Sequence, residues 1–249
     1  MRRKLAAGNW KMNGTTQSLK DLSALGSAHK GSGVDILICP PATLLAPAVQ
    51  TVSGSDIRIG GQDCHDQTNG AHTGDISAEM LVDAGASAVI LGHSERRADH
   101  HETSEDVRAK AKAAQAAGLM TVICLGESLL QREATNTLDI IGAQLSLSVP
   151  DGATGENLVV AYEPIWAIGS GLTPTPDQIG EVHDFMRTRL ERRFGAGVGR
   201  SVRLLYGGSV KPENAAEIFA ISNVDGALVG GASLSAKDFS PIISALEAS

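Results

Sequence analysis

Short apolar segments recur along the whole chain, and polar segments long enough to form helices separate them. Several of the apolar segments, such as 36–38, 88–91 and 158–161, show no polar alternation. Strands buried on both faces, as in a parallel sheet, have this continuous apolar pattern. The segments begin near Lys4, Val34, Ile57, Ala88, Leu119, Leu158, Arg203 and Asp225, and successive starts lie 22 to 45 residues apart. This spacing leaves room for a helical crossover each time, so the pattern predicts eight β-α units.

The segments between the predicted strands carry helical signals. Thr103 and Asp106 have the spacing of a capping box, and Gly118 stands where that helix should end. In the segment 177–194, one helical face is apolar, formed by Ile179, Val182, Met186, Leu190 and Phe194. No linker or charge block divides the chain. We therefore expect a single α/β domain, residues 1–249, that forms a closed (β/α)8 barrel of eight parallel strands within a ring of helices, rather than an open sheet.

Composition and charge exclude several classes of function. The 249 residues include 21 Lys and Arg against 28 Asp and Glu, a net charge of −7, which argues against a general nucleic-acid binder. The longest apolar runs are too short for a membrane span, and the apolar stretch near the start is too short for a secretory signal. Cys39, Cys64 and Cys124 are widely spaced, which is typical of a reducing compartment. We expect a soluble cytoplasmic protein.

Polar residues that could take part in catalysis or binding follow the predicted strands, one strand after another. They are Asn9, Lys11, Gln62, His93, Glu95, Glu127, Glu163, Ser209, Gly230 and Gly231. Active sites of (β/α)8 barrels lie at the carboxyl ends of the strands, so these residues are expected to share one site.

Glu163 directly follows a buried strand and precedes Pro164, which would hold the carboxylate rigidly at the wall of a site. Partial burial raises a carboxylate pKa and makes it a useful base. The alternative is an ordinary salt-bridge partner of a barrel lysine. The next segment, 164–171, is apolar and ends in glycines, which is typical of a lid that excludes water, with Gly169 and Gly171 near its far hinge.

His93 and Lys11 have both structural and functional readings. Ser94 can begin a short helix, which would place His93 at the positive end of a dipole, lower its pKa and favour a neutral N–H donor. The alternative is an ordinary capping or surface histidine. Lys11 fits a Schiff-base nucleophile, an anion anchor or a solvated charge. It lies two residues beyond the predicted strand, which favours the electrostatic anchor.

Two Gly-Gly pairs, at 207–208 and 230–231, follow the last two strands. Bare backbone N–H groups in such turns hold anions, and this is the usual phosphate site of barrels, so a phosphorylated substrate is predicted. The tract 100–102 (His-His-Glu) reads as a solvated loop rather than a metal site. Cys124 reads as a buried packing thiol. Glu95 and Glu127 are expected to orient Lys11 and its neighbours.

Together these residues resemble the triosephosphate isomerase family over the whole chain. The motifs that carry the resemblance are Gly8-Asn9-Trp10-Lys11-Met12-Asn13, Gly92-His93-Ser94-Glu95-Arg96-Arg97, Cys124-Leu125-Gly126-Glu127, the segment 161–171 (AYEPIWAIGSG), Tyr206-Gly207-Gly208-Ser209-Val210 and Val229-Gly230-Gly231-Ala232. The resemblance implies interconversion of dihydroxyacetone phosphate and D-glyceraldehyde 3-phosphate, a step of glycolysis and gluconeogenesis. It implies neither metal nor organic cofactor.

The resemblance also implies a role for each site residue. Glu163 would move the proton, and neutral His93 would polarise the substrate oxygens. Lys11 and Asn9 would stabilise the enediolate, with Glu95 beside Lys11. The phosphate would be held by backbone N–H groups of Gly169, Ser209, Gly230 and Gly231. A barrel that binds sugar phosphates without turnover and a Schiff-base aldolase are the alternatives.

The segment 64–77 resembles the dimer loop of the family, and its length is itself unusual. A homodimer is therefore implied, with Thr73 at the tip of the loop reaching toward a partner. The chain departs from the family's commoner residues in this loop at His72, where an apolar aromatic is usual, and at Asp75, where Glu is usual. In the lid, Ser170 replaces the commoner Thr, and Leu172 stands where many members carry Lys.

Overall fold

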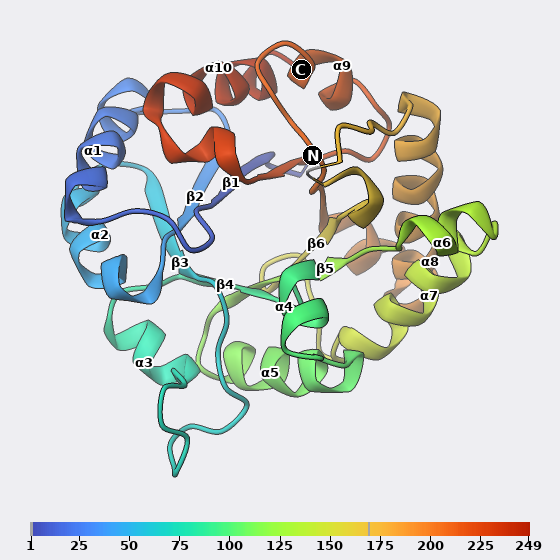
Figure 1. Ribbon diagram of the computed structural model, residues 1–249, viewed down its shortest axis with the longest axis horizontal. Helices are drawn as coiled ribbons and strands as arrows, with labels where there is room; N and C mark the ends of the chain where they lie inside the picture. Colours follow the sequence, from blue (N-terminus) through green and yellow to red (C-terminus); the bar gives the residue numbers. More distant parts are fainter. Residues whose placement is uncertain (1, 169) are drawn as a thin grey trace.

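The computed structural model describes residues 2–168 and 170–249. Within these residues, eight parallel strands close into a barrel in chain order, with β8 pairing with β1 (Figure 1). Every strand begins within one residue of its predicted start, which confirms the predicted fold class. The strands are β1 (Leu5–Asn9), β2 (Asp35–Cys39), β3 (Ile57–Gly61), β4 (Ala88–Leu91), β5 (Met120–Leu125), β6 (Leu158–Tyr162), β7 (Arg203–Tyr206) and β8 (Gly226–Val229).

Helices surround the barrel on its outside (Figure 1). They are α1 (Leu19–Ala28), α2 (Leu45–Thr51), α3 (Ala78–Asp83), α4 (Ser94–Asp99), α5 (Ser104–Ala116), α6 (Leu129–Glu133), α7 (Thr137–Ser148), α8 (Pro176–Ser201), α9 (Ala215–Phe219) and α10 (Ala236–Glu247). Four short 3-10 helices also occur among the described residues: η1 (Thr16–Ser18), η2 (Ala42–Leu44), η3 (Ile165–Ala167) and η4 (Gly231–Leu234). Of the described helices, none has the length and apolar character needed to cross a membrane.

The strands are apolar without alternation because both of their faces are buried. In β1, Leu5 and Ala7 belong to a cluster that includes Leu37, Ile90 and other alternate strand residues, whereas Ala6 belongs to a larger cluster shared with the helices. Successive side chains of a strand point to opposite faces, so one set fills the barrel and the other packs under the helices.

The predicted helix signals are present in α5 and α8. Thr103 and Asp106 form a reciprocal capping box, and Gly118 just beyond α5 has a φ of 88°. Ile179, Val182, Met186 and Leu190 of the predicted stripe are buried. The helical run continues past Phe194, but Gly195 (φ 80°, ψ 160°) interrupts it, so α8 consists of two helices joined at a break.

Ion pairs occupy the amino ends of the strands. Asp225, just before β8, contacts Arg187 of α8 and Arg2, both with N–O distances below 3 Å. Asp35, which begins β2, contacts Arg3, Arg58 and Arg203. These pairs link the start of the chain to helices and strands distant in sequence.

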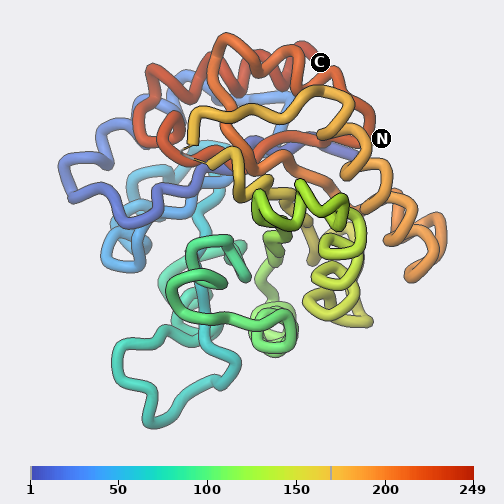
Figure 2. The backbone as a smooth tube through the Cα atoms, turned by 45° about the vertical axis from the view of Figure 1, so that its right-hand side comes forward, coloured from blue at the N-terminus to red at the C-terminus, as the bar shows by residue number. Residues whose placement is uncertain are grey.

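The segment 64–77 between β3 and α3 extends away from the barrel as a long loop (Figures 1 and 2). Its neck is closed by a hydrogen bond from the N–H of His65 to the carbonyl of Ile76, 2.8 Å long, and its residues 66–75 are exposed.

Candidate active site

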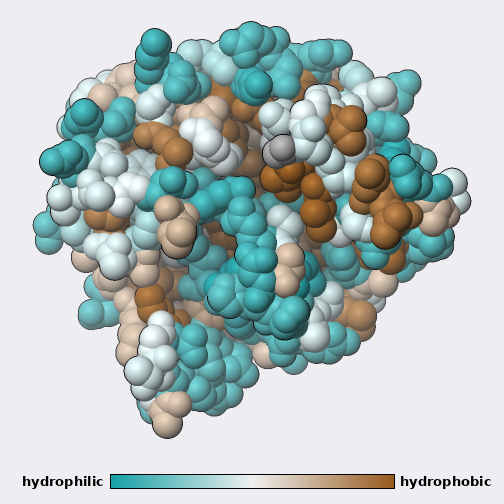
Figure 3. Space-filling model, viewed as in Figure 1, coloured by the Kyte–Doolittle hydropathy of each residue, from teal (hydrophilic) through white to brown (hydrophobic). Residues whose placement is uncertain are grey.

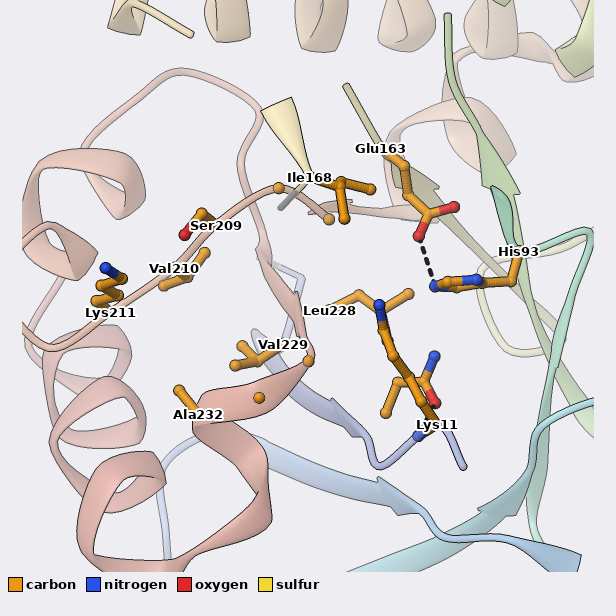
Figure 4. Close-up of a pocket in the computed structure, with 15 residues that line it drawn as sticks. Lys11, His93, Glu163, Ile168, Ser209, Val210, Lys211, Leu228, Val229 and Ala232 are labelled. Atoms are coloured by element: carbon orange, nitrogen blue, oxygen red, sulfur yellow. Dashed lines mark hydrogen bonds and ion pairs between the residues drawn. The ribbon is translucent and has the colours of Figure 1, made fainter. Parts of the chain in front are cut away.

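A cavity of about 360 Å³ opens among the loops that follow the carboxyl ends of the strands (Figure 4). Residues from five strand ends or their loops line it, which places distant parts of the chain around one space. They are Asn9, Lys11, His93, Glu163, Ile168, Gly207, Gly208, Ser209, Val210, Lys211, Leu228, Val229, Gly230, Gly231 and Ala232. Glu95 lies beside this cavity, on the wall of an adjoining one that also contains Asn9, Lys11 and His93.

Glu163 and His93 contact each other on the wall of the cavity. Oε1 of Glu163 lies 2.8 Å from Nε2 of His93 (Figure 4). Oε2 accepts a hydrogen bond of 2.9 Å from the N–H of Ser94. Both side chains are buried. Glycine at 126 and 207 makes room for this residue, because a Cβ at either position would fall within 3 Å of Glu163 atoms. A buried carboxylate beside an imidazole is an arrangement that can take up and release a proton.

The first turn of α4 orients the imidazole of His93. His93 is the N-cap residue, and its Nδ1 accepts a hydrogen bond of 3.3 Å from the N–H of Glu95. In a neutral ring this contact leaves the hydrogen on Nε2, which points toward Glu163.

The expectation of a lowered His93 pKa is wrong for this arrangement of side chains. Burial lowers the pKa, but the Glu163 carboxylate and, more weakly, Glu95 outweigh burial and raise it overall. A carboxylate in direct contact with the ring therefore decides the direction of the pKa shift. The charge of His93 therefore depends on where the Glu163 carboxylate lies.

Lys11 is held by its backbone and by its ammonium group. Its φ of 52° is unusual for a residue other than glycine. The N–H of Lys11 donates to Oδ1 of Asn9 at 2.9 Å, and Nε2 of Gln62 donates to the Lys11 carbonyl at 2.8 Å. Nζ lies 2.7 Å from Oε1 of Glu95. Gln62 thus fixes the strained turn that aims the lysine into the site.

The loops after β7 and β8 form a cradle at the other side of the cavity (Figure 4). Ser209, Gly230 and Gly231 all line it. Glycine is required at 208, where a Cβ would lie 2.2 Å from the Tyr206 hydroxyl. The N–H and hydroxyl of Ser233 both donate to the Gly230 carbonyl, which fixes the turn into η4. Gly169, the remaining expected phosphate ligand, lies outside the described residues.

Three contributors to the site were missed by sequence reasoning. Lys211 and Leu228 line the cavity, and Lys211 brings a positive charge to the side of the glycine turns. Its position two residues after Ser209 was an available signal. Arg97 supports the wall from behind, because it donates to the carbonyls of Gly92 and Cys124 at 2.8 and 3.2 Å.

The expectation that Glu127 orients Lys11 is wrong. Glu127 is fully buried, and its Oε1 accepts hydrogen bonds from the Tyr162 hydroxyl at 3.0 Å and from Nε1 of Trp166 at 2.9 Å. Burial raises its pKa, although these donors oppose the shift. Glu127 therefore anchors η3, the first turn of the segment 164–174, to the end of β6.

Two further predictions from the sequence concern Cys124 and the tract 100–102, and the structure confirms only the first in full. Cys124 is buried in the barrel interior, and burial together with nearby Glu163 raises the pKa of its thiol, which confirms a neutral packing residue. His100 and His101 are exposed, but Glu102 is buried and contacts Arg96 and Lys110. The solvated-loop reading is wrong for Glu102, because these two cations and Asp63 bury it in an ion-pair cluster.

The sequence and the fold of the chain both match proteins of one known family. The family model of triosephosphate isomerase matches residues 4–246. The chain belongs to the triosephosphate isomerase family. A triosephosphate isomerase of Ruegeria pomeroyi is 68% identical to it over 99% of this chain and 98% of the relative. A triosephosphate isomerase of Brucella melitensis is 58% identical over 95% of this chain and 94% of the relative.

Solved structures agree with the sequence comparison. The crystal structure of triosephosphate isomerase from Bartonella henselae superimposes with a TM-score of 0.92 at 49% identity, covering 98% of each chain. The protein is thus an aldose-ketose isomerase with the family's (β/α)8 barrel, which confirms the predicted enzyme class.

Proposed function

We propose that the cavity converts dihydroxyacetone phosphate and D-glyceraldehyde 3-phosphate into each other, with Glu163 as the base and His93 as the hydrogen-bond donor to the substrate oxygens. The observation that carries this proposal is the buried pair of Glu163 and His93, 2.8 Å apart, on the wall of the cavity that Lys11 also lines. The reaction is a step of glycolysis and gluconeogenesis.

The steps follow from the positions of these groups. The Glu163 carboxylate removes a proton from the carbon next to the substrate carbonyl, and the electron pair moves to the carbonyl oxygen to give an enediolate. The Nε2–H of His93 and the ammonium of Lys11 stabilise that charge, with the amide of Asn9 beside them. The proton of the adjacent hydroxyl group passes by way of Nε2 of His93 to the other enediolate oxygen, and protonated Glu163 delivers a proton to the neighbouring carbon, which leaves the carbonyl group on the first carbon. Ser209, Gly230, Gly231 and Gly169 would supply backbone N–H groups to the phosphate, and Lys211 lies on the same side.

Glu163 must first release its present partners. Its two oxygens are engaged by His93 and Ser94, so the carboxylate has to turn toward the substrate before it can act. This rotation removes the main cause of the raised His93 pKa, and burial then favours the neutral ring. The movement of Glu163 therefore prepares its partner as a neutral donor, because Nδ1 already accepts the Glu95 N–H.

The segment 164–174 is suited to act as the lid. Ile168 lines the cavity, and Trp166 is hydrogen-bonded to buried Glu127. Ile165 and Leu172 of this segment and Leu130 of α6 are exposed apolar side chains, and Figure 3 shows hydrophobic side chains on the face that it presents. Closure over the substrate would exclude water from the enediolate and prevent loss of phosphate.

A coupled assay in heavy water tests the proposal. A carboxylic acid exchanges its proton with solvent, so the product should carry deuterium at the carbon that receives the proton. Glu163→Gln should lower turnover by about 10²–10⁴-fold and lower the rate of deuterium incorporation with it. Rapid turnover by Glu163→Gln would contradict a carboxylate base.

Lys11 supports isomerisation over the two alternatives. Nζ of Lys11 lies 2.7 Å from Oε1 of Glu95, so it is held in an ion pair at the side of the cavity, which disfavours a Schiff-base aldolase. Borohydride treatment in the presence of substrate should leave Lys11 unmodified. A barrel that binds without turnover has no need of a base in contact with an imidazole.

We also propose that two copies form a homodimer through the loop 64–77, with Thr73 at its tip reaching the partner's site. The loop extends from the barrel (Figure 2), and exposed Met12, Met80 and Val82 supply apolar surface for a partner. Sedimentation at micromolar concentration should give about twice 25.8 kDa; a fully active monomer would exclude the dimer.

Cys39, Cys64 and Cys124 are free and buried, which supports a cytoplasmic location.

A further inference from the structure

A second cavity lies on the outside of the barrel, where α7 packs against both α5 and α8, and the reaction proposed above does not use it. Its volume of about 520 Å³ is within the roughly 300–1,000 Å³ of small-molecule sites. It shares no lining residue with the cavity that contains Glu163. α7 and α8 lie at the right of Figure 1, away from the loop 64–77 that we assign to the contact between two copies. The lining residues are Arg108, Gly142, Leu145, Ser146, Asp151, Arg189, Leu190, Arg192 and Arg193.

The lining of this second cavity is basic, although the chain as a whole is acidic. Four arginines and one aspartate line it, which is a local excess of three positive charges in a chain of net charge −7. Three of the arginines, at 189, 192 and 193, belong to α8. Residues three or four apart are neighbours on a helix surface, and like charges at this spacing repel each other. The cluster therefore lowers the stability of α8 unless an anion compensates it.

Asp151 compensates one side of the cluster. Its Oδ2 lies 2.6 Å from Arg108 and its Oδ1 lies 2.7 Å from Arg193, so a single carboxylate bridges two guanidinium groups. Both arginines also donate to the Val149 carbonyl, at 2.8 Å each, just beyond the end of α7. These contacts hold the two guanidinium groups in place, and this wall of the cavity already binds an oxyanion.

Arg189 and Arg192 supply the positive charge on the other side. The ion pairs among residues 2–168 and 170–249 include neither of them, and both side chains are exposed. The guanidinium of Arg189 lies over the ring of Phe185, 5.8 Å from its centroid. Phe185 packs against Gly142 of α7, where a Cβ would lie 3.2 Å from the ring. Stacking on Phe185 orients the Arg189 guanidinium and leaves its N–H donors available to a ligand.

We propose that this second cavity binds a short oligophosphate. Guanidinium groups form paired hydrogen bonds with phosphate oxygens, so Arg189 and Arg192 can engage successive phosphates of one chain. A cleft lined by one sign of charge concentrates ions of the other sign, and an excess of three charges suits several linked phosphates better than one. The exposed Ser146 lines the cavity and brings a hydroxyl donor to the same ligand.

Isothermal titration calorimetry with inorganic triphosphate tests the proposal on the full-length chain, in a buffer of low ionic strength because salt screens such contacts. Wild type should bind one equivalent at this cavity, and inorganic monophosphate should bind at least tenfold more weakly. The double variant Arg189→Gln with Arg192→Gln should weaken triphosphate binding at least tenfold. Asp151→Asn should strengthen it several-fold, because it removes the competing carboxylate and releases donors of Arg108 and Arg193.

Two control variants locate the bound triphosphate. The double variant Lys20→Gln with Lys30→Gln removes the same charge at exposed positions outside the cavity and should leave binding unchanged. Lys211→Gln changes a cation of the cavity that contains Glu163 and should also leave it unchanged. Circular dichroism establishes that each variant is folded.

Three results would overturn the proposal. If wild type binds triphosphate no more tightly than monophosphate, the cavity is not an oligophosphate site. An equal loss in the double lysine variant would indicate only a nonspecific effect of net charge. Loss of binding in Lys211→Gln, with the double arginine variant unchanged, would place the triphosphate in the cavity that contains Glu163.

Discussion

The two ends of the barrel each bury a histidine near carboxylates, and they use it in opposite ways. At the carboxyl end, His93 contacts Glu163, which raises the pKa of the imidazole despite its burial. At the amino end, His183 of α8 is fully buried, and burial lowers its pKa to about 4, although its Nδ1 hydrogen-bonds the Asn223 carbonyl.

The carboxylates at the two ends, Glu163 and Asp225, differ in the number of partners that hold them. Each oxygen of Glu163 has one partner, and a cavity lies beside it. Asp225 at the amino end contacts Arg2, Arg187 and the N–H of Leu204, all at 2.8–2.9 Å. A carboxylate with three fixed donors is held in one position, whereas one with fewer partners beside a cavity can exchange them for substrate. The number of partners, rather than burial, separates the carboxylate proposed as the base from the carboxylate at the amino end.

The largest effect is expected when the base is removed. Glu163→Gln should lower kcat by about 10²–10⁴-fold, the range of general-base catalysis, while Tm stays close to wild type. Coupled kinetics and thermal unfolding measure the two quantities. Glu156→Gln, at an exposed position, is the matched control and should change neither. A large fall in Tm without a fall in kcat would show that Glu163 stabilises the fold and is not the base.

At the amino end, a substitution is expected to lower stability and leave kcat unchanged. Asp225→Asn leaves the buried Arg187 guanidinium without its counter-charge, which should cost about 3–5 kcal/mol of unfolding free energy and roughly 6–20 °C in Tm. The kcat of the folded fraction should remain that of wild type. Asp151, although it contacts Arg108 and Arg193, is mostly exposed, so Asp151→Asn should leave Tm close to that of wild type. Equal losses in both variants would remove the distinction.

The pH dependence of stability tests the histidines. With a pKa of about 4 in the folded state, His183 is neutral there, while the unfolded chain takes up a proton below about pH 6.5. The unfolded state then binds more protons, so His183 should cost about 2 kcal/mol of stability as pH falls from 7 to 5. Chemical unfolding at several pH values should show this slope, and His183→Gln should reduce it.

His93 contributes with the opposite sign. Because its folded-state pKa is raised, its stabilisation is present below about pH 6.5 and is lost as pH rises through the raised value. Glu163→Gln removes the cause, so it should abolish this contribution while leaving the His183 slope intact. A Glu163→Gln variant with an unchanged pH profile would show that the ion pair does not influence stability.

The smallest effect is expected at the lid anchor. Trp166→Phe removes the hydrogen bond to Glu127 but keeps the aromatic ring. A net hydrogen bond is worth about 0.5–1.5 kcal/mol, so kcat should change by roughly 2- to 10-fold, with more phosphate released per turnover. Inorganic phosphate measured against isomerised substrate reports the loss of protection. A fall in kcat with no additional phosphate would make Trp166 a positioning residue only.

The strands could be predicted from the sequence because continuous apolar segments such as 88–91 have few other ways to be buried. The residues that line the site could be predicted because parallel strands bring their carboxyl ends to one edge of the barrel. The partner of Glu127 could not, since Trp166 approaches it only after β5 and β6 pair and η3 folds. Nor could the direction of the His93 shift, which depends on a side-chain rotation of Glu163. The grouping of Arg108 with Arg189 and Arg192 depends on how α5, α7 and α8 pack together.

The closure of the barrel between β1 and β8 has a consequence for how the chain is made. Leu5 pairs with Gly226 and Gly8 with Val229, so the first strand receives its second neighbour only when almost the whole chain has left the ribosome. Until then both terminal strands of the growing sheet present unpaired backbone groups, which are templates for association with other chains. Synthesis of this protein therefore passes through a long interval in which the nascent chain is open to aggregation, and the arrival of β8 ends it.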